Sequence, residues 1–360
     1  TREAFRLFTE SIRIRQDEKN SALAFLSGGM DSRAIVGALR ADDIPVTTLN
    51  FSPDGSQDQV LAAEIAFKLR CDHIQMSHDG GDLTTFRPDL AMLYSSLIND
   101  GRVAGNERKI WSGDGGSVAL GTVHLDETIV VDMRKGDYIK ATRRYRLENS
   151  IGLPLRTMTA TERSWHRDYL LNCILGEIAL LEHEDPAQNL FLFLMLNDQQ
   201  RHLDDMYEED AEHRLSYHLP FFDSDLLECV FALPLEYRLY HRFYSDWFNL
   251  FDDTIRSVPW QTYPDHVDCP LPVEDTLSYQ WDSSRFPTSR RGRLEVTGRG
   301  LLQALGARSV RPMSRLALVA SSFLHAFGRE NYEYVYDACE KYQSYRDVCS
   351  VCQRKFWKMC

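Results

Sequence analysis

The sequence predicts an α/β protein built on a doubly wound parallel sheet, followed by a helical layer and an irregular and helical C-terminal extension. Two observations support this. Short apolar segments alternate with helical segments from residue 4 to residue 113, and two of the apolar segments end in glycine-rich turns. We divide the chain into an N-terminal helix (1–20), an α/β core (21–137), a helical part (138–258) and an extension (259–360).

The elements of the core follow from the spacing of apolar residues. Phe5, Phe8, Ile12 and Ile14 stand near helical spacing, and the continuous apolar character of "SALAFL" is typical of a buried parallel strand. In the third helix we expect Val60 and Ile65 on the apolar face. Helices are predicted over 4–15, 32–41, 58–70 and 87–100, and strands over 21–26, 44–51, 71–77 and 108–113.

Beyond residue 138 the pattern becomes helical. The aromatic stretch 237–251 is interpreted as the core of this helical layer rather than a base-stacking platform. Residues 285–315 contain many arginines and a single acid, Glu295, which suits either an anionic substrate or a solvated basic loop. The apolar stretch 313–328 is interpreted as packed core, with contact to a membrane surface as the alternative.

Charge and hydropathy exclude several classes of protein. The formal net charge of −12 disfavours nucleic acid as a partner, because the surface repels phosphate backbones. No apolar stretch approaches the length of a membrane span, and the first residues lack the apolar core of a signal peptide. We therefore expect a cytoplasmic protein without a transmembrane segment.

Cysteines gather near the C-terminus. The "CSVC" stretch, with Cys349 and Cys352, has the spacing of half a zinc site, which Cys360 together with Cys339 or Cys269 could complete. The alternative is a set of free thiols or one disulfide.

The first glycine-rich turn, "SGGMDS" at 27–32, has the composition of an anion-binding loop. Glycines between a strand and a helix expose backbone N–H groups at the positive end of the helix dipole. Asp31 is unfavourable beside a phosphate unless a cation lies between them, which suggests Mg²⁺. The turn lacks the GK[ST] ending of a Walker loop.

Four stretches together resemble the synthetase domain of the asparagine synthetase family, within the ATP pyrophosphatase (PP-loop) superfamily. They are "SGGMDS", "TLNFSPDGSQDQVLAAEIAFKLRCDHIQ", "WSGDGGSVALG" and "HLPFFDSDLLECVFALP". The resemblance covers roughly residues 3–260 and implies a Rossmann-like fold of the adenine nucleotide alpha-hydrolase type. It does not include the family's N-terminal glutaminase domain.

The resemblance implies an enzyme that uses ATP to adenylate a carboxylate, releases pyrophosphate, and transfers ammonia or an amine to form an amide. Asp31 would hold Mg²⁺, Asp114 would orient the nucleophile or accept its proton, and Glu148 would be a supporting carboxylate. The residues expected to bind the nucleotide are Leu26, Asn50, Ser112 and Gly113 around adenosine, and Ser27, Gly28, Gly29, Asp31 and Ser32 around pyrophosphate.

This chain departs from the family at two positions. Ser117 stands where the family usually has a metal-binding Asp, which leaves it a weak ligand. Where the family has a Lys that stabilises adenylation, the chain offers Arg242 or His241.

These departures argue against free aspartate as the substrate. The resemblance instead suggests an amidotransferase acting on a sugar uronate or a nucleotide- or lipid-linked precursor of a polysaccharide. Ammonia or the amine is expected from a separate glutaminase, from the medium or from the substrate itself.

Two other functions remain open. One is a tRNA-modifying enzyme of the same superfamily, which the C-terminal cysteines favour and the acidic surface disfavours. The other is a nucleotide-binding protein without catalytic activity, suggested by Ser117 and the missing Lys.

Overall fold

The computed structural model describes most of the first 277 residues and parts of the remainder. The described ranges are 1–16, 21–76, 83–103, 108–149, 159–207, 215–277, 293–294, 297–298, 300–302 and 314–328. The chain divides into two compact units. The first consists of residues 1–137 and 181–282, and the second of residues 138–180 and 283–360.

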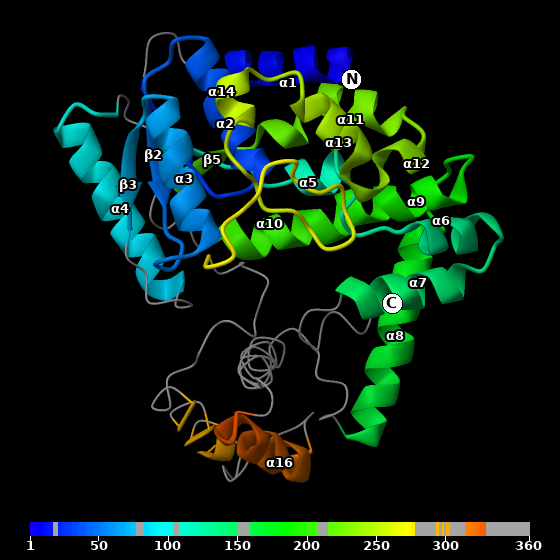
Figure 1. Cartoon of the computed structure of the whole chain (residues 1–360). Coiled ribbons are helices and arrows are strands. Elements are labelled where there is room, and N and C mark those ends of the chain that lie inside the picture. Colours follow the sequence, from blue (N-terminus) through cyan, green and yellow to red (C-terminus); the bar gives the residue numbers. More distant parts are fainter. Residues whose placement is uncertain are drawn as a thin grey trace. The chain divides into compact units, whose positions relative to one another are not determined.

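The first unit contains a five-stranded, all-parallel sheet with the order β3-β2-β1-β4-β5 (Figure 1). The strands are β1 (Ala22–Phe25), β2 (Val46–Asn50), β3 (Asp72–Gln75), β4 (Arg108–Trp111) and β5 (Leu215–His218). The predicted doubly wound α/β class is thereby confirmed. The prediction of a purely helical segment over 138–258 is wrong at β5, which pairs with β4 at the edge of the sheet.

Helices cover both faces of the sheet. Helices α2 (Met30–Ala41) and α3 (Gln57–Lys68) pack on β1, β2 and β3, while α4 (Leu83–Asn99) lies on the other side of β2 and β3 in Figure 1. Leu23, Leu49 and Ile110 of three strands form one buried cluster with Leu90 and Tyr94 of α4. In α3 Ile65 is buried as predicted, but Val60 is exposed because Leu61 and Ala62 face the sheet instead.

Side chains fix the starts of several helices. Ser56 caps α3, Asp126 caps α6 and Asp223 caps α11 through hydrogen bonds to backbone N–H groups. The remaining elements of the first unit are α1 (Arg2–Arg15), α5 (Gly116–Ala119), α6 (Glu127–Arg134), α9 (Pro186–Phe193), the π-helix η1 (Leu194–Gln199), α10 (Gln200–Tyr207), η3 (Pro220–Phe222), α11 (Ser224–Phe231), α12 (Leu235–Arg238), η4 (Leu239–His241), α13 (Arg242–Phe248) and α14 (Asp253–Arg256).

An aromatic core joins α1, η3 and α13. Phe8 lies 4.8 Å from Phe221 and 4.9 Å from Trp247, measured between ring centroids, and Trp247 lies 5.1 Å from Phe251. Trp247, Phe8 and Phe221 are fully buried. This confirms the interpretation of the aromatic stretch 237–251 as core, since rings of this size contribute most when they are buried together.

The second unit contains α7 (Tyr138–Asn149), α8 (Ala160–Ile178) and α16 (Arg315–Ala326). Leu318 of α16 is buried, but Leu316 is 84% exposed and Phe327, just after the helix, is 79% exposed. The interpretation of 313–328 as packed core is therefore wrong for these two side chains.

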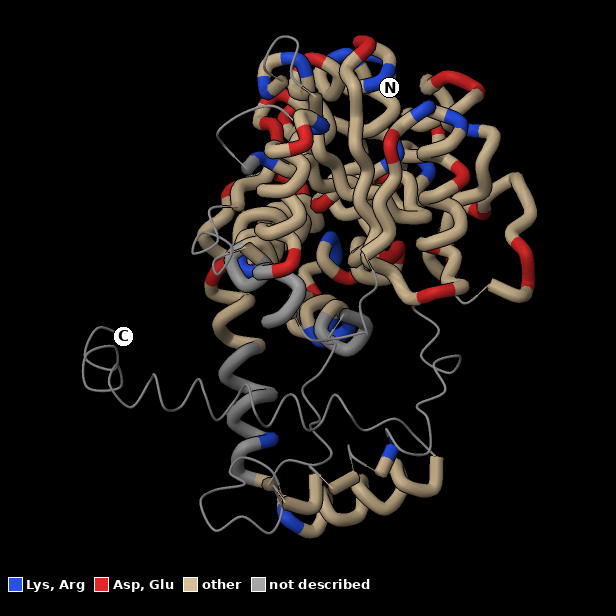
Figure 2. The backbone as a smooth tube through the Cα atoms, turned by 90° about the vertical axis from the view of Figure 1, so that its left-hand side faces the viewer, with Lys and Arg blue, Asp and Glu red and all other residues tan. Residues whose placement is uncertain are grey.

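Acidic and basic residues are interspersed over the first unit, as Figure 2 shows for one view. Among the described residues, no helix has both the length and the hydropathy needed to cross a membrane.

Candidate functional site

The two glycine-rich loops meet at the point where the strand order of the sheet reverses. The chain winds outward from β1 to β2 and β3 on one side, and to β4 and β5 on the other. The loop after β1 and the loop after β4 therefore follow neighbouring parallel strands at the same edge of the sheet. In open parallel sheets, this crevice at the carboxyl ends of the strands is where ligands bind.

Glycines allow the two loops to touch. A Cβ atom on Gly113 would lie 2.7 Å from the backbone nitrogen of Ser32, and one on Gly116 would lie 2.6 Å from Cγ of Asp31. Both distances are too short for real contacts, so these positions need glycine. The close approach places the first turn of α2 directly against the start of α5.

Asp31 lies at this contact, in the first turn of α2. Its carboxylate accepts hydrogen bonds from the backbone nitrogen and the hydroxyl of Ser117, both at 3.0 Å, and from the hydroxyl of Tyr244. Burial raises the pKa of Asp31 to about 6, although these hydrogen bonds act in the opposite direction. The structure thus brings together two residues singled out from the sequence, Asp31 and Ser117.

The backbone N–H groups of residues 27–29 point to side chains of the protein itself. The N–H of Ser27 donates to Oγ of Ser32 at 3.0 Å, that of Gly28 to Oδ1 of Asp58 at 2.8 Å, and that of Gly29 to Oγ of Ser27 at 3.3 Å. The prediction that these three groups face an anion is wrong, because each is bound within the protein. The part left for an anion is the first turn of α2, whose N–H groups have no partner within the helix.

Arg33 binds the backbone carbonyls of this loop. It is fully buried, and its guanidinium group donates five hydrogen bonds of 2.7 to 3.3 Å, all to backbone carbonyls. The acceptors are the carbonyls of Gly28, Gly29, Ile255, Val258 and Pro259. Burial lowers the pKa of Arg33 to about 9. With their carbonyls bound on one side, the loop residues are fixed in one conformation.

Asn50 and Asp58 attach the same loop to β2 and α3. The Asn50 amide donates to the carbonyl of Leu26 at 2.7 Å, so its side chain joins two strand ends, and its backbone carbonyl accepts from the N–H of Met76 at 2.8 Å. Burial raises the pKa of Asp58, which accepts the Gly28 N–H. The sequence analysis did not single out Asp58; its place just after the helix cap at Ser56 was the available signal.

Asp114 forms a second cluster on the loop after β4. Its carboxylate accepts hydrogen bonds from the hydroxyl of Ser112, at 2.6 Å, and from the hydroxyl of Tyr207 in α10. The ring of Tyr207 packs on Tyr217 of β5, with centroids 4.1 Å apart. Burial raises the pKa of Tyr207 above its ordinary value, so this phenol is a hydrogen-bond donor. Sequence reasoning missed Tyr207, the single aromatic residue of a charged helix.

His241 is buried close to Asp31. Its ring stacks between Tyr244 and Tyr263, and neither ring nitrogen has a hydrogen-bond partner among the described residues. Burial lowers the pKa of His241 to about 3, so the ring is neutral. Tyr240 and His241 both have positive φ, at 57° and 61°, a conformation that costs energy and is concentrated at functional sites.

Of the other two predicted catalytic residues, Arg242 is not brought to Asp31. Arg242 is exposed, with its guanidinium carbon 5.5 Å from the ring centroid of Tyr240. Glu148 belongs to α7 in the second unit, and its side chain lies outside the described residues. Cys339, Cys349, Cys352 and Cys360 lie outside them as well.

A cavity of about 90 Å³ lies between these groups. It is lined by Ser27, Gly29, Met30, Asp31, Ser117, His241, Gln261, Thr262, Tyr263 and Val267. Asp31 is the only charged residue in that lining, so a polyphosphate chain entering here needs a cation to offset both charges. This donor set fits a magnesium ion carried by phosphate, which takes one or two carboxylates from the protein. In the described part of the chain, no three His, Cys, Asp or Glu residues gather as a metal site.

The fold and the site define a doubly wound α/β protein with two glycine loops at its switch point. Residues 3–103 match the family model of asparagine synthase, and this match is consistent with a synthetase domain of the asparagine synthetase family in this part of the chain. The matched segment includes β1, β2, β3 and the first glycine loop; the second loop lies beyond it. A search of curated proteins finds no match to the chain.

Proposed function

We propose that this protein is an ATP-dependent, amide-forming ligase that activates a carboxylate as its adenylate. In the first step the substrate carboxylate forms a bond to the α-phosphorus of ATP, and pyrophosphate leaves. In the second step ammonia or an amine attacks the acyl carbon, AMP leaves with the bonding electron pair, and the amine loses a proton. The match to the asparagine synthase family supports this class of reaction.

The observation that carries the proposal is the contact between the two glycine loops. It places Asp31, Ser117 and the first turn of α2 around one cavity at the switch point of the sheet. The N–H groups of that turn suit the polyphosphate of a nucleotide. Asp31 would hold Mg²⁺, which neutralises negative charge on the phosphates when it is bound. Neutral His241, which lines the same cavity, would donate a hydrogen bond to a phosphate oxygen where the family has a Lys.

Asp114 suits the second step. Ser112 and Tyr207 hold its carboxylate through two hydrogen bonds, which orient it at the carboxyl end of β4. A carboxylate oriented in this way can accept the proton that the amine loses. Ser112 and Gly113 remain our candidates for backbone contacts to adenosine, together with Leu26 and Asn50.

The substrate we propose is an anionic carboxylate other than free aspartate, such as a uronate or a nucleotide- or lipid-linked precursor of a polysaccharide. The support is in the sequence, where arginines dominate residues 285–315. Guanidinium groups pair with carboxylate and phosphate through two parallel hydrogen bonds. Ammonia, whether free or supplied by a separate glutaminase, would be the second substrate.

The test is release of pyrophosphate and AMP from ATP and Mg²⁺ with ammonium present, across uronates, nucleotide uronates, aspartate and short peptides. Asp31→Asn keeps the shape of the side chain and removes its charge. Asp100→Asn changes an exposed aspartate at the end of α4 and is the matched control. We expect turnover with one substrate class that is lost in Asp31→Asn and retained in Asp100→Asn. Equal turnover in both variants would contradict the proposal.

A second candidate is a nucleotide-binding protein without catalytic activity. The observation that favours it is Ser117, which donates both of its hydrogen bonds to Asp31 at the position where the family usually has an acid. Affinity for ATP measured by calorimetry, without pyrophosphate release on any substrate of the panel, would favour this candidate.

A further inference from the structure

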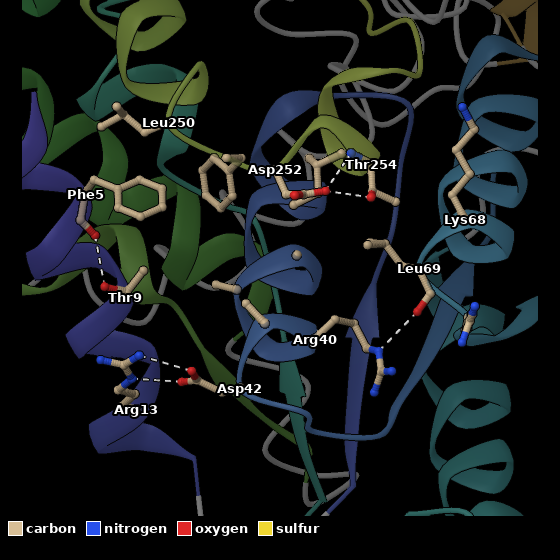
Figure 3. Close-up of a pocket in the computed structure, with 16 residues that line it drawn as sticks. Phe5, Thr9, Arg13, Arg40, Asp42, Lys68, Leu69, Leu250, Asp252 and Thr254 are labelled. Carbon is tan, nitrogen blue, oxygen red and sulfur yellow. Dashed lines mark hydrogen bonds and ion pairs between the residues drawn. The ribbon is translucent and has the colours of Figure 1, made fainter.

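A groove of about 540 Å³ crosses the C-terminal half of α2, in the first unit. Side chains of α1 and of residues 250–251 line it on one side of α2, and side chains around the end of α3 line it on the other (Figure 3). Its volume is within the range of pockets that hold small molecules. Asp31 is in the first turn of α2, whereas the groove is formed by residues 37–42 at the other end, on the order of 15 Å along the helix at about 1.5 Å per residue.

The floor of the groove is apolar because α2 presents small residues there. Gly37, Ala38 and Ala41 lie between Leu69 on one side and Phe251 on the other. A Cβ atom on Gly37 would lie 2.1 Å from Cδ1 of Ile255, so glycine is needed at this position for the chain around α14 to pack on α2. The result is a floor without long side chains, on which a flat or aliphatic group can lie.

Basic side chains outnumber acidic ones at the rim. The lining includes Arg13, Arg40, Lys68 and Arg70 against Asp42 and Asp252. In a chain whose net charge is −12, this is a local excess of positive charge. Charge complementarity therefore favours an anionic ligand.

The hydrogen bonds show which of these charges are available. Arg13 and Asp42 pair with each other at 2.8 and 3.0 Å (Figure 3), and Asp252 accepts from Thr254. Lys68 donates to Ser257.

The other two arginines keep donors free. Arg40 is held by the carbonyls of Leu69 and Ile44, through Nε and Nη1, which leaves Nη2 without a hydrogen bond to any described residue. The guanidinium group of the exposed Arg70 likewise has no hydrogen bond or ion pair within the described ranges, where only the backbone N–H of this residue is bound, to the carbonyl of Phe67. Arg40 and Arg70 are thus the two guanidinium groups of the rim that can bind a ligand.

We propose that this groove binds a small amphipathic anion, with an apolar body on Ala38 and Ala41 and one carboxylate or phosphate group at Arg40 and Arg70. Arg40 is fixed by its two carbonyl partners, so little side-chain entropy is lost when it binds. The ligand does not take part in chemistry at Asp31, which lies at the opposite end of α2. The site does not depend on the proposed ligase activity.

The test is a ¹⁹F NMR titration of the whole protein with three probes. They are 4-(trifluoromethyl)benzoate, 4-(trifluoromethyl)phenyl phosphate and the neutral 4-(trifluoromethyl)benzyl alcohol. We expect at least one anionic probe to bind about tenfold or more tightly than the alcohol, as charge-assisted hydrogen bonds imply. The more tightly bound anion tells a carboxylate ligand from a phosphate ligand. Equal affinity for the alcohol, or binding of none of the probes, would overturn the proposal.

Variants then locate the probe. Ala41→Trp fills the floor from an exposed position, and Arg70→Gln removes one exposed charge, so circular dichroism should show both folded. We expect each to weaken the anionic probe about fivefold or more, in line with one charge-assisted hydrogen bond or one apolar contact surface. Arg102→Gln, an exposed arginine paired with Asp72, is the matched control and should leave the affinity unchanged. Unchanged affinity in both Ala41→Trp and Arg70→Gln would mean that the probe binds elsewhere, which would overturn the proposal. Displacement of the probe by equimolar inorganic phosphate would mean that the site recognises only the anionic group, which would overturn it as well.

Discussion

Asp31 and Asp114 lie on two loops that touch, yet their surroundings differ. Asp31 is buried, accepts three hydrogen bonds and has its pKa raised to about 6 by burial. Asp114 is half-buried, on the loop after β4, and accepts from two hydroxyl groups. The comparison teaches that one carboxylate is part of the contact between the two loops, whereas the other is held by hydroxyl groups of the loop after β4 and of α10.

The first effect is expected from Gly116→Ala, because its new Cβ would collide with the Asp31 carboxyl group. Overpacking of this kind costs about 1–3 kcal/mol, and here it also separates the two loops. We expect the free energy of unfolding of the first unit, measured in urea, to fall by about that amount. Gly176→Ala in α8, where a Cβ meets nothing within 4 Å, is the control and should not destabilise the protein. Equal effects at the two positions would mean that the contact between the loops contributes nothing to the free energy of unfolding.

The second effect concerns pH. The pKa of Asp31 is raised to about 6 in the folded state, above its ordinary value, so the folded protein binds this proton more tightly than the unfolded chain does. The associated stability is therefore fully present only below the ordinary pKa of 3.8 and is lost progressively as the pH rises through about 6. Its size is on the order of 3 kcal/mol, at about 1.4 kcal/mol per pKa unit.

Urea unfolding of the wild type and of Asp31→Asn, followed between pH 4 and pH 7.5, measures this term. The free energy of unfolding of the wild type should fall relative to that of the variant as the pH rises. Parallel curves for the two proteins would show that the pKa of Asp31 is the same in the folded and unfolded states.

The smallest effects come from a matched pair, Tyr244→Phe and Tyr207→Phe, which removes one hydroxyl from each aspartate. Tyr244 is fully buried, so losing its hydrogen bond to Asp31 should cost about 1–3 kcal/mol of unfolding free energy. Tyr207 is half-buried, so its loss should cost less than about 1 kcal/mol and act instead on the amine-dependent step of turnover. A larger loss of stability from Tyr207→Phe than from Tyr244→Phe would reverse the comparison between the two aspartates.

The core of the fold could be predicted because its signals are local. Strands β1 and β2 contain apolar runs, and the more polar β3 ("DHIQ") and β4 ("RKIW") lie between helical segments in a regular alternation. Strand β5, "LSYH", is also short and partly polar and pairs with a single neighbour at the sheet edge. It follows a long series of helices, so no alternation of strand and helix marks it in the sequence.

The site was predictable only where its residues belong to one motif. Asp31 and the glycines of both loops stand out in the sequence. Tyr244 contacts Asp31 from 213 positions away, and Tyr207 reaches Asp114 across 93. The internal use of the loop N–H groups depends on Asp58, which lies 30 positions beyond Gly28. Such contacts depend on tertiary packing, which no local pattern in one sequence reports.

The five hydrogen bonds of Arg33 also have a consequence for how the protein is made. Two of their acceptors, Gly28 and Gly29, are synthesised early, and the other three, Ile255, Val258 and Pro259, are synthesised more than 220 residues after Arg33. Until residues 255–259 have left the ribosome, the Arg33 guanidinium group, which is buried in the folded protein, lacks three of its five acceptors. Domains fold largely as units during synthesis. The loop that begins the site therefore reaches its final conformation only near the end of translation of the first unit.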